Sequence, residues 1–412
     1  TAVAEAGPVL GHHVAIGDMK MIAVRARYLR EENLAVVLAE SGVIALGETL
    51  EDARVLSRSL FSFFGLPFGA VDFPTSFACV HRVWRDCPAL YIELRKAFGE
   101  SKNSICKEET QMRLIVHGQQ AFGQSVLEKL IERGEDIVGV YVAPDKGKPD
   151  PLKVAAEEAG LPVFQPTTYK EPEVWDQMKS LSPDLCVMAF VTLFVPEEAL
   201  YLPTHDSIQY HPSLLPLHRG PSAINWPIIM GRKETGLSIF WPDNGLDEGP
   251  ILLQKTCTIE ENDTLGTVYF DKLFPMGVDA MMESVDLVKQ GNAPRIDQDH
   301  SQKTYESWCR KADVELNFAK SMQEVHNMIR GADPVPGAWT TCGGAEIQLY
   351  GSTKAESAAG APGEIVDISS DGMVIACGDG GVNVTRVRGA EGKVAASDFA
   401  ASAELSAGAK LG

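Results

Sequence analysis

A histidine and an aspartate lie in two loops whose glycines and prolines fix the backbone around them. His211 begins the run His211-Pro-Ser-Leu-Leu-Pro216, which is followed by Arg219-Gly220, and Asp247 lies in the run Gly245-Leu-Asp-Glu-Gly-Pro250. Side chains of these two types can carry out acyl transfer together. An imidazole stabilises or protonates a developing oxyanion, and a carboxylate orients or deprotonates the nucleophile. We therefore take His211 and Asp247 as candidate catalytic residues.

Both loops follow short segments whose composition is typical of strands. Ser207–Tyr210 precedes the histidine loop, and Leu237–Trp241 precedes the aspartate loop. Ligands of open α/β sheets bind in the crevice beyond the carboxyl ends of the strands. A lone histidine or a lone aspartate in a turn is most simply structural, but the pairing of these two loops favours chemistry. Glu248 is a competing carboxylate; adjacent residues usually point to different sides, so we expect only one of the two to act.

Strands and helices alternate from Met112 onward. Short apolar runs alternate with segments that have apolar residues at helical spacing, which predicts a parallel sheet with helices on both faces, an α/β, Rossmann-like domain. The predicted strands are 112–118, 136–142, 162–164 and 184–189, and the predicted helices are 122–133, 151–159, 174–181, 222–230 and 264–289.

A different pattern follows Gly291. Residues 291–305 are polar and contain proline, so they are interpreted as a linker, and short β-like runs between turn signals then predict a small β-barrel of the OB-like kind. The last stretch is rich in Ala, Ser and Gly and is expected to fray. The predicted organisation is an extension of unknown role over 1–111, a catalytic domain over 112–304, a β-barrel over 305–394 and a flexible tail over 395–412.

Charge and composition narrow the function classes. The chain carries a net charge of −19, of which residues 112–412 contribute −17 through 25 Lys+Arg and 42 Asp+Glu. Such an acidic body repels phosphate backbones, so nucleic acid is not the expected partner. No apolar run is long enough to span a membrane. The eight cysteines form no CxxC pair and are interpreted as reduced thiols of a cytoplasmic or mitochondrial-matrix protein.

Longer motifs around the two loops resemble a known family. The run Tyr210–Gly220, the run Ser222–Trp226, the run Gly245–Gln254 and the run Pro334–Thr340 are similar to those of the formyltransferases that use 10-formyltetrahydrofolate. Within that family they look most like the hydrolase domain found in 10-formyltetrahydrofolate dehydrogenases. The resemblance covers about two thirds of the chain, from residue 112 to about residue 390.

The resemblance implies roles for individual residues. The family's catalytic histidine falls on His211 and its catalytic aspartate on Asp247, while the loop that contacts folate falls on Leu193, Phe194 and Val195. Two positions before the histidine, transferases usually have asparagine and the hydrolase domain has an apolar residue. Gln209 matches neither, and its amide either donates to the formyl oxygen from a longer arm or points away.

The reaction implied is removal of the formyl group from 10-formyltetrahydrofolate, giving tetrahydrofolate and formate, without a metal. In longer members the formyl group passes to a phosphopantetheine arm on a carrier domain and then to an NADP-dependent aldehyde dehydrogenase domain. No motif of either partner domain follows residue 390, so we expect a fragment of such a protein or a free-standing hydrolase. The alternatives are a methionyl-tRNA formyltransferase and a folate-binding module without catalysis.

Overall fold

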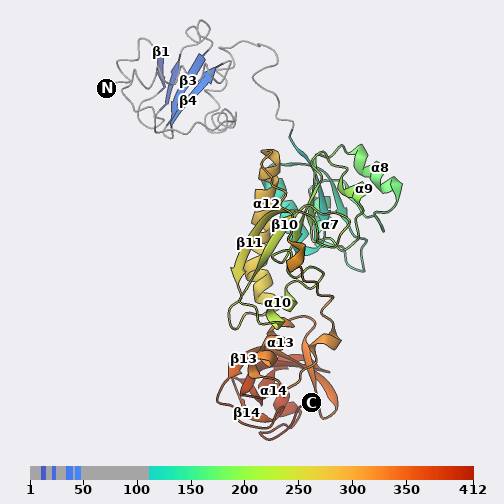
Figure 1. The fold of residues 1–412 in the computed structure, drawn as a ribbon, viewed down its shortest axis with the longest axis vertical. Coiled ribbons are helices and arrows are strands. Elements are labelled where there is room, and N and C mark those ends of the chain that lie inside the picture. Colours follow the sequence, from blue (N-terminus) through green and yellow to red (C-terminus); the bar gives the residue numbers. More distant parts are fainter. Residues whose placement is uncertain (1–10, 15–20, 25–33, 40–41, 48–110) are drawn as a thin grey trace. The chain divides into compact units, whose positions relative to one another are not determined.

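The computed structural model describes residues 11–14, 21–24, 34–39, 42–47 and 111–412 (Figure 1). The chain forms two compact units, Thr1–Glu109 and Thr110–Gly412. In the first unit, four strands form an antiparallel sheet in chain order: β1 (Gly11–Val14), β2 (Met21–Val24), β3 (Leu34–Ala39) and β4 (Gly42–Gly47). Most of the predicted extension therefore lies outside the described residues.

The second unit is built on a seven-stranded sheet in which five neighbouring strands are parallel, which confirms the predicted α/β fold. Two antiparallel strands extend one edge of that sheet. The outermost, β11, is absent from the predicted strands because only its first two residues are buried, and exposed residues alternate with partly buried ones along the rest. The strand order is β11-β10-β9-β8-β5-β6-β7. The bounds are β5 (Arg113–Gly118), β6 (Asp136–Val142), β7 (Val163–Phe164), β8 (Leu185–Ala189), β9 (Ser207–His211), β10 (Glu234–Phe240) and β11 (Ile251–Thr258).

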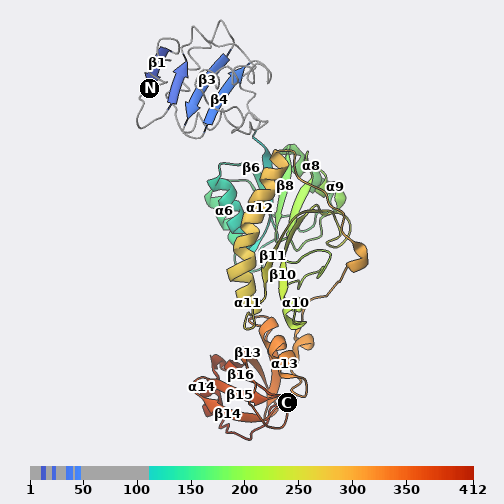
Figure 2. The same cartoon turned by 60° about the vertical axis from the view of Figure 1, so that its left-hand side comes forward.

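Helices cover both faces of this sheet (Figure 2). One face packs against α6 (Gln120–Glu132), α7 (Pro151–Glu158) and α12 (Phe274–Lys289), and the other against α8 (Pro172–Ser180) and α9 (Glu197–Leu200), while α10 (Asn225–Ile229) follows the histidine loop. The predicted helix over 264–289 begins at α11 (Leu265–Thr267) and contains a π-helical turn over Val268–Leu273. In the described part of the chain, none of the helices has the length and apolar character needed to cross a membrane.

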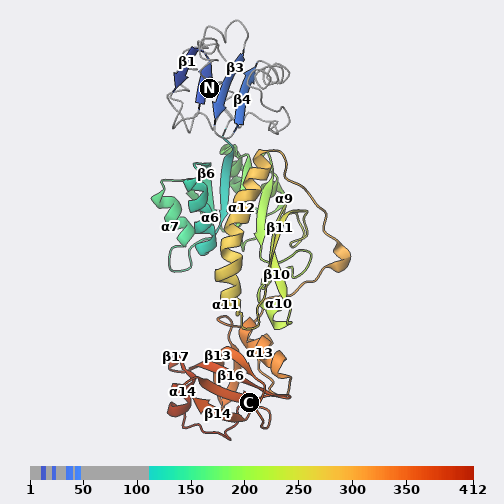
Figure 3. The same cartoon turned by 90° about the vertical axis from the view of Figure 1, so that its left-hand side faces the viewer.

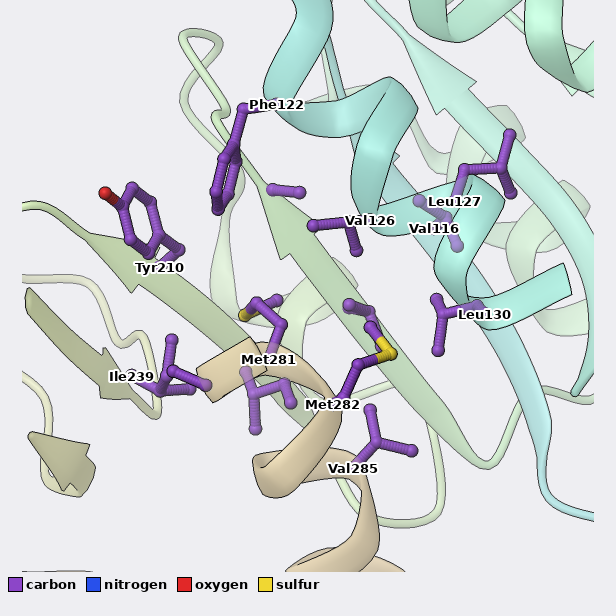
Figure 4. Close-up of a cluster of buried hydrophobic side chains, with 14 of the residues drawn as sticks. Val116, Phe122, Val126, Leu127, Leu130, Tyr210, Ile239, Met281, Met282 and Val285 are labelled. Carbon is purple, nitrogen blue, oxygen red and sulfur yellow. The ribbon is translucent and has the colours of Figure 1, made fainter. Parts of the chain in front are cut away.

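A hydrophobic core fills the space between the sheet and helices α6 and α12 (Figure 4). Strand side chains that point into this core are not available to form a site. Phe122 of α6 lies 4.3 Å from Tyr210 of β9, ring centre to ring centre, and Met281 of α12 belongs to the same buried cluster. Successive side chains of a strand point to opposite faces. Because Tyr210 is buried on the α6 and α12 face, Gln209 and His211 project from the other face.

The carboxyl-terminal region is an antiparallel sheet, which confirms the expected all-β region. Its strand order is β12-β13-β16-β15-β14, and β17 pairs with β16. The strands are β12 (Ala338–Cys342), β13 (Ala345–Ala355), β14 (Ile365–Ser369), β15 (Gly372–Ala376), β16 (Gly381–Gly389) and β17 (Gly392–Ala395).

The structure differs from the expectation of a fraying tail over 395–412. Residues Ala396–Ser402 form helix α14, whose Ala396 and Ala400, one turn apart, are buried. At the chain end, the amide of Leu411 donates to the carbonyl of Gly363, and the amide of Gly412 donates to the carbonyl of Thr341. The end of the chain therefore bonds to residues at both outer strands of the sheet. Composition alone did not predict this ordered end. Small residues can pack closely without a strong hydrophobic signal, and backbone hydrogen bonds form whatever the side chains are.

Helix α13 (Met322–Gly331) joins the all-β region to the α/β region (Figure 3). Arg330 is 2% exposed, and its guanidinium donates to the carbonyls of Glu260 and Asp263 in the loop before α11. His326 is fully buried between the carbonyl of Glu261 and the hydroxyl of Ser352. Helix α13 is thus bound by buried hydrogen bonds both to the α/β region and to the all-β region.

Candidate active site

His211 is the last residue of β9 and is buried, with 6% of its surface exposed. Its Nε2 lies 3.0 Å from the carbonyl oxygen of His218. A carbonyl only accepts hydrogen bonds, so Nε2 carries the hydrogen and donates it. The other ring nitrogen, Nδ1, lies 3.6 Å from Oδ2 of Asp247. The fold therefore brings together two candidate residues that are 36 positions apart.

Asp247 reaches His211 through the hairpin between β10 and β11. Because β10 is antiparallel to β9, its last residue, Phe240, pairs with Gln209, and the loop after it returns over the sheet face that carries His211. Oδ2 of Asp247 accepts a hydrogen bond of 2.9 Å from the amide of Gly220. The Asp247 backbone has φ +55°, a left-handed conformation that aspartate tolerates better than most residues.

Two glycines permit this close approach of loops. Gly220 has φ +102°, and a Cβ there would lie 2.6 Å from the carbonyl oxygen of Glu306. A Cβ on Gly249 would lie 1.8 Å from the carbonyl oxygen of Trp241, inside the hairpin that carries Asp247. A larger residue at either position would push the loops apart, so the glycines seen in the motifs are steric requirements of the site.

The segment expected to be a linker, 291–305, also supports the aspartate loop. The Gln298 amide nitrogen donates to the carbonyls of Asp247 and Gly249, and its oxygen accepts from the guanidinium of Arg219. Further along, Arg219 exchanges backbone hydrogen bonds with this strip, donating to Thr304 and accepting from Glu306. The segment does connect the α/β region to the all-β region, and most of its residues are exposed, but the buried Gln298 gives it a second task in supporting the site loops.

Glu248 does not compete with Asp247 for His211. One of its carboxylate oxygens accepts from Nη1 of Arg219 at 2.8 Å, and Lys303 lies 3.9 Å from the same oxygen. The Glu248 side chain is 37% exposed, whereas that of Asp247 is 9% exposed. The two adjacent carboxylates point to different partners, as the sequence led us to expect.

His218 forms a second buried pair beside the first. Its Nδ1 lies 3.1 Å from a carboxylate oxygen of Glu306. Burial lowers the pKa of the His218 imidazole, and the carboxylate of Glu306 offsets part of that effect. Sequence reasoning missed both residues: His218 was only part of a quoted motif, and Glu306 followed the supposed linker. His218 thus contacts Glu306 through its side chain and His211 through its backbone carbonyl.

Gln209 lies on the same sheet face as His211, two residues earlier on β9. It is partly buried and is flanked by Met188 of β8 and Phe240 of β10. Within residues 111–412 its side-chain amide makes no hydrogen bond with another protein group. An amide in this position is able to donate to a substrate oxygen.

The three residues of the predicted folate loop occupy different environments. The loop follows the carboxyl end of β8, next to the strand that carries His211. Phe194 is 56% exposed, with the ammonium of Lys170 5.5 Å from its ring centre. Leu193 is partly buried, and Val195 is 8% exposed within the core beside α9. The loop thus lies at the carboxyl-end edge of the sheet, and of its three residues Phe194 is the most exposed.

An open hollow of about 380 Å³ lies at the opposite edge of the sheet and is not part of this site. It is four strands from β9, which corresponds to about 19 Å at normal strand spacing. Its lining residues come from β7 and α8 and their flanks: Val163, Phe164, Gln165, Pro166, Glu173, Val174 and Gln177. Among the described residues, no group of three His, Cys, Asp or Glu side chains is arranged to hold a metal ion.

The arrangement around His211 is suited to proton transfer at a carbonyl centre. With its Nε2 hydrogen committed to His218, a neutral His211 presents the lone pair of Nδ1 beside the carboxylate of Asp247. A nucleophile between them could donate a proton to either atom, and a protonated ring would face a developing negative charge. Burial of both side chains strengthens these interactions, since the local dielectric is low.

Two protein-family models match most of residues 111–412. The family model described as formyl transferase matches residues 111–284, and the model described as formyl transferase, C-terminal domain, matches residues 309–404. A methionyl-tRNA formyltransferase of Geobacter metallireducens is 35% identical over 310 residues, covering 73% of this chain and 99% of that protein. The chain therefore belongs to the formyltransferase family.

Within that family the chain is similar to the 10-formyltetrahydrofolate dehydrogenases, as its motifs predicted. It is 42% identical over 315 residues to the human mitochondrial enzyme, covering 72% of this chain and 34% of that protein. It is 44% identical over 248 residues to the cytosolic enzyme of Xenopus tropicalis, covering 59% of this chain and 28% of that protein. The chain spans about a third of the length of these relatives.

Solved structures support the same fold. HypX from Aquifex aeolicus, solved with tetrahydrofolic acid, has a TM-score of 0.54 at 18% identity, covering 71% of this chain and 47% of that chain. WlaRD, a sugar 3N-formyl transferase, has a TM-score of 0.52 at 17% identity, covering 66% of this chain and 97% of that chain. These neighbours show that the formyltransferase architecture is present.

Proposed function

We propose that this protein removes the formyl group from N10 of 10-formyltetrahydrofolate. The observation that carries the proposal is the buried pair of His211 and Asp247, 3.6 Å apart at the end of β9 in a formyltransferase-family fold. The similarity to 10-formyltetrahydrofolate dehydrogenases, at 42–44% identity, favours this substrate.

The proposed reaction is hydrolysis, or transfer when a better nucleophile is present. Asp247 orients a water molecule and accepts its proton as the water oxygen bonds to the formyl carbon. His211, assisted by the amide of Gln209, stabilises the oxyanion. The carbon–N10 bond then breaks, N10 takes a proton from the protonated pair, and formate and tetrahydrofolate leave. General acid–base help contributes about 10²–10⁴-fold in rate, and one oxyanion donor contributes about 10²–10³-fold.

We assign the chemistry to residues 112–304 and regard 305–394 as the all-β companion region, with Leu193, Phe194 and Val195 next to the folate. As part of a longer protein, the site would pass the formyl group to a phosphopantetheine thiol on a carrier domain, and an NADP-dependent aldehyde dehydrogenase domain would oxidise it. The relatives named as cytosolic or mitochondrial favour the cytoplasm or the mitochondrial matrix as its location.

The test is incubation of the purified chain with 10-formyltetrahydrofolate, following tetrahydrofolate by absorbance and formate by a coupled assay. We expect stoichiometric formation of both products, and faster tetrahydrofolate formation when a small thiol acceptor is added. The Asp247→Asn variant serves as the blank for spontaneous loss of the formyl group. Equal rates for the wild-type protein and this blank would reject the proposal.

Methionyl-tRNA formylation is the second candidate, favoured by the 99% coverage of the Geobacter metallireducens enzyme. The net charge of −17 over residues 112–412 opposes it, since phosphate contacts need a basic surface. Adding charged initiator tRNA to the same assay separates the two reactions. Formyl-methionyl-tRNA formation that outpaces formate release, and that falls steeply with salt, would favour the second candidate.

A further inference from the structure

Gln298 forms a bridge between the two loops that carry the candidate catalytic pair. It is 5% exposed, and all of its amide hydrogen-bonding capacity is used within the protein. The nitrogen donates to the carbonyl oxygens of Asp247 at 2.9 Å and Gly249 at 2.7 Å. The oxygen accepts from Nη2 of Arg219 at 2.7 Å and from Nε at 3.3 Å.

The bridge closes a ring around the aspartate. Arg219 is 2% exposed and precedes Gly220, whose amide donates to the Asp247 carboxylate at 2.9 Å. One path thus runs from Arg219 through the Gln298 side chain to the Asp247 backbone. The other runs from Gly220 directly to the Asp247 side chain. Together they fix the residue at both its backbone and its carboxylate.

The backbone of Asp247 needs such support. Its φ of +55° is sparsely populated for a residue with a Cβ, and conformations of this kind persist when the surroundings over-determine them. The segment that carries Gln298 is itself anchored, because Ile296 and Ile251 exchange two backbone hydrogen bonds at the start of β11. The backbone near Gln298 is therefore held independently of the aspartate loop, so the Gln298 side chain can restrain the position of that loop.

We propose that Gln298 is a positioning residue that holds Asp247 in register with His211. The inference rests on the proposed function, since it assigns Asp247 the task of accepting the nucleophile's proton. Both polar atoms of the Gln298 amide group are occupied by protein partners, so none is left to bind the substrate. Its contribution should therefore appear in turnover and not in substrate affinity.

The kinetic test uses Gln298→Glu and Gln298→Met in the whole chain. The glutamate substitution would retain an acceptor for Arg219 but lose both donors to the aspartate loop, and the methionine substitution keeps the length without any polar contact. We expect kcat to fall about 10- to 100-fold while KM for 10-formyltetrahydrofolate changes less than about threefold. Gln302→Met, at an exposed glutamine in the same segment, is the matched control and should retain normal turnover.

A double-mutant comparison separates positioning from general support of the fold. In the Asp247→Asn background, Gln298→Glu should cause no further loss of turnover, because residues that act as a unit are not additive. A full additional loss in that background, or a kcat within about twofold of normal for both single variants, would overturn the inference.

A third measurement needs no turnover, so it tests the inference even where the proposed function fails. In protein labelled with ¹⁵N-glycine, the amide of Gly220 reports on its bond to the Asp247 carboxylate. We expect Gln298→Met to move this resonance and to speed its hydrogen exchange, in the same direction as Asp247→Asn. An unchanged Gly220 amide would refute the positioning role, whereas wild-type protein without formate release would refute the function alone.

Discussion

The Nε2 of His211 lies 3.0 Å from the carbonyl oxygen of His218, so only one of the two ring nitrogens faces Asp247. This contact assigns the hydrogen of the neutral ring to Nε2. The Nδ1 atom, 3.6 Å from the carboxylate, is then the one that can take up a proton during the reaction. The carbonyl thus orients the ring for the chemistry we propose.

The first prediction concerns this pair. His211→Asn and Asp247→Asn should each lower the rate of formate release by about 10²–10⁴-fold, since each removes general acid–base help. The double variant should lose little more than the worse single variant, because the two groups act on one formyl group. His205→Asn and Asp279→Asn, at exposed positions outside the site, are the controls and should keep normal rates. Steady-state kinetics with matched circular dichroism spectra will decide.

The second prediction concerns Gln209, whose side chain shares a sheet face with His211. Gln209→Leu keeps the approximate size of the side chain but removes the amide donor. If the amide contacts the oxyanion, kcat should fall about 10²-fold, as for loss of one oxyanion-hole donor. Gln290→Leu, at an exposed position, controls for the loss of an amide in general. Undiminished turnover in Gln209→Leu would mean that the amide points away from the formyl group.

The third prediction separates two neighbours in the proposed folate loop. Phe194 is 56% exposed, so Phe194→Ala should raise KM for the folate substrate about tenfold and leave the free energy of unfolding almost unchanged. Val195 is 8% exposed in the core, so Val195→Ala should lower that free energy by about 2 kcal/mol. Substrate titrations and urea unfolding of both variants provide the measurement. A normal KM in Phe194→Ala would remove this ring from the substrate site.

The fourth prediction concerns stability in acid. His117 on β5 is 3% exposed, and burial lowers its pKa to about 3. In the unfolded chain the imidazole has a pKa of about 6.5, so the unfolded state binds the proton first. The contribution of His117 to the free energy of unfolding is therefore fully present above about pH 6.5. It is lost progressively as the pH falls toward about 3. Between pH 7 and pH 5 the loss is about 2 kcal/mol.

Replacing His117 by a residue that does not titrate removes this pH-dependent contribution to the free energy of unfolding. The free energy of unfolding of His117→Leu, from urea titrations at pH 7 and pH 5, should fall by about 2 kcal/mol less than that of the wild-type protein over this range. His205→Leu, at an exposed histidine, should follow the wild-type dependence. Identical pH dependence in wild type and His117→Leu would show that His117 is charged or solvated in the folded state.

The sequence predicted the features whose signals are local. Alternating strand and helix patterns predicted the parallel sheet, and two loops rich in glycine and proline marked His211 and Asp247. The structure brings those two side chains together. Turn signals after residue 340 likewise predicted strands, because glycine and polar residues separate the apolar runs there.

Other features depend on partners that are remote in the chain. Gln298 bonds to residues 49, 51 and 79 positions earlier, and nothing in its neighbourhood distinguishes it from a glutamine in a linker. Edge strand β11 lacks a continuous apolar run because one of its faces is exposed. The buried positions of the terminal helix are two alanines, Ala396 and Ala400, whose small side chains give no hydrophobic signal in the sequence.

The strip of chain that carries Gln298 also leads to the all-β region. Before it arrives, the indole nitrogen of Trp226 donates to the carbonyl of Ser307, and the amide of Cys309 donates to the hydroxyl of Ser222. These two bonds attach Ser307 and Cys309 to helix α10 and to the residues just before it. The stretch between Gln298 and Cys309 is therefore held by hydrogen bonds at both ends. A displacement of the all-β region would have to break the hydrogen bonds at Trp226 and Ser222 before it reached Gln298 and, through Gln298, the loop of Asp247.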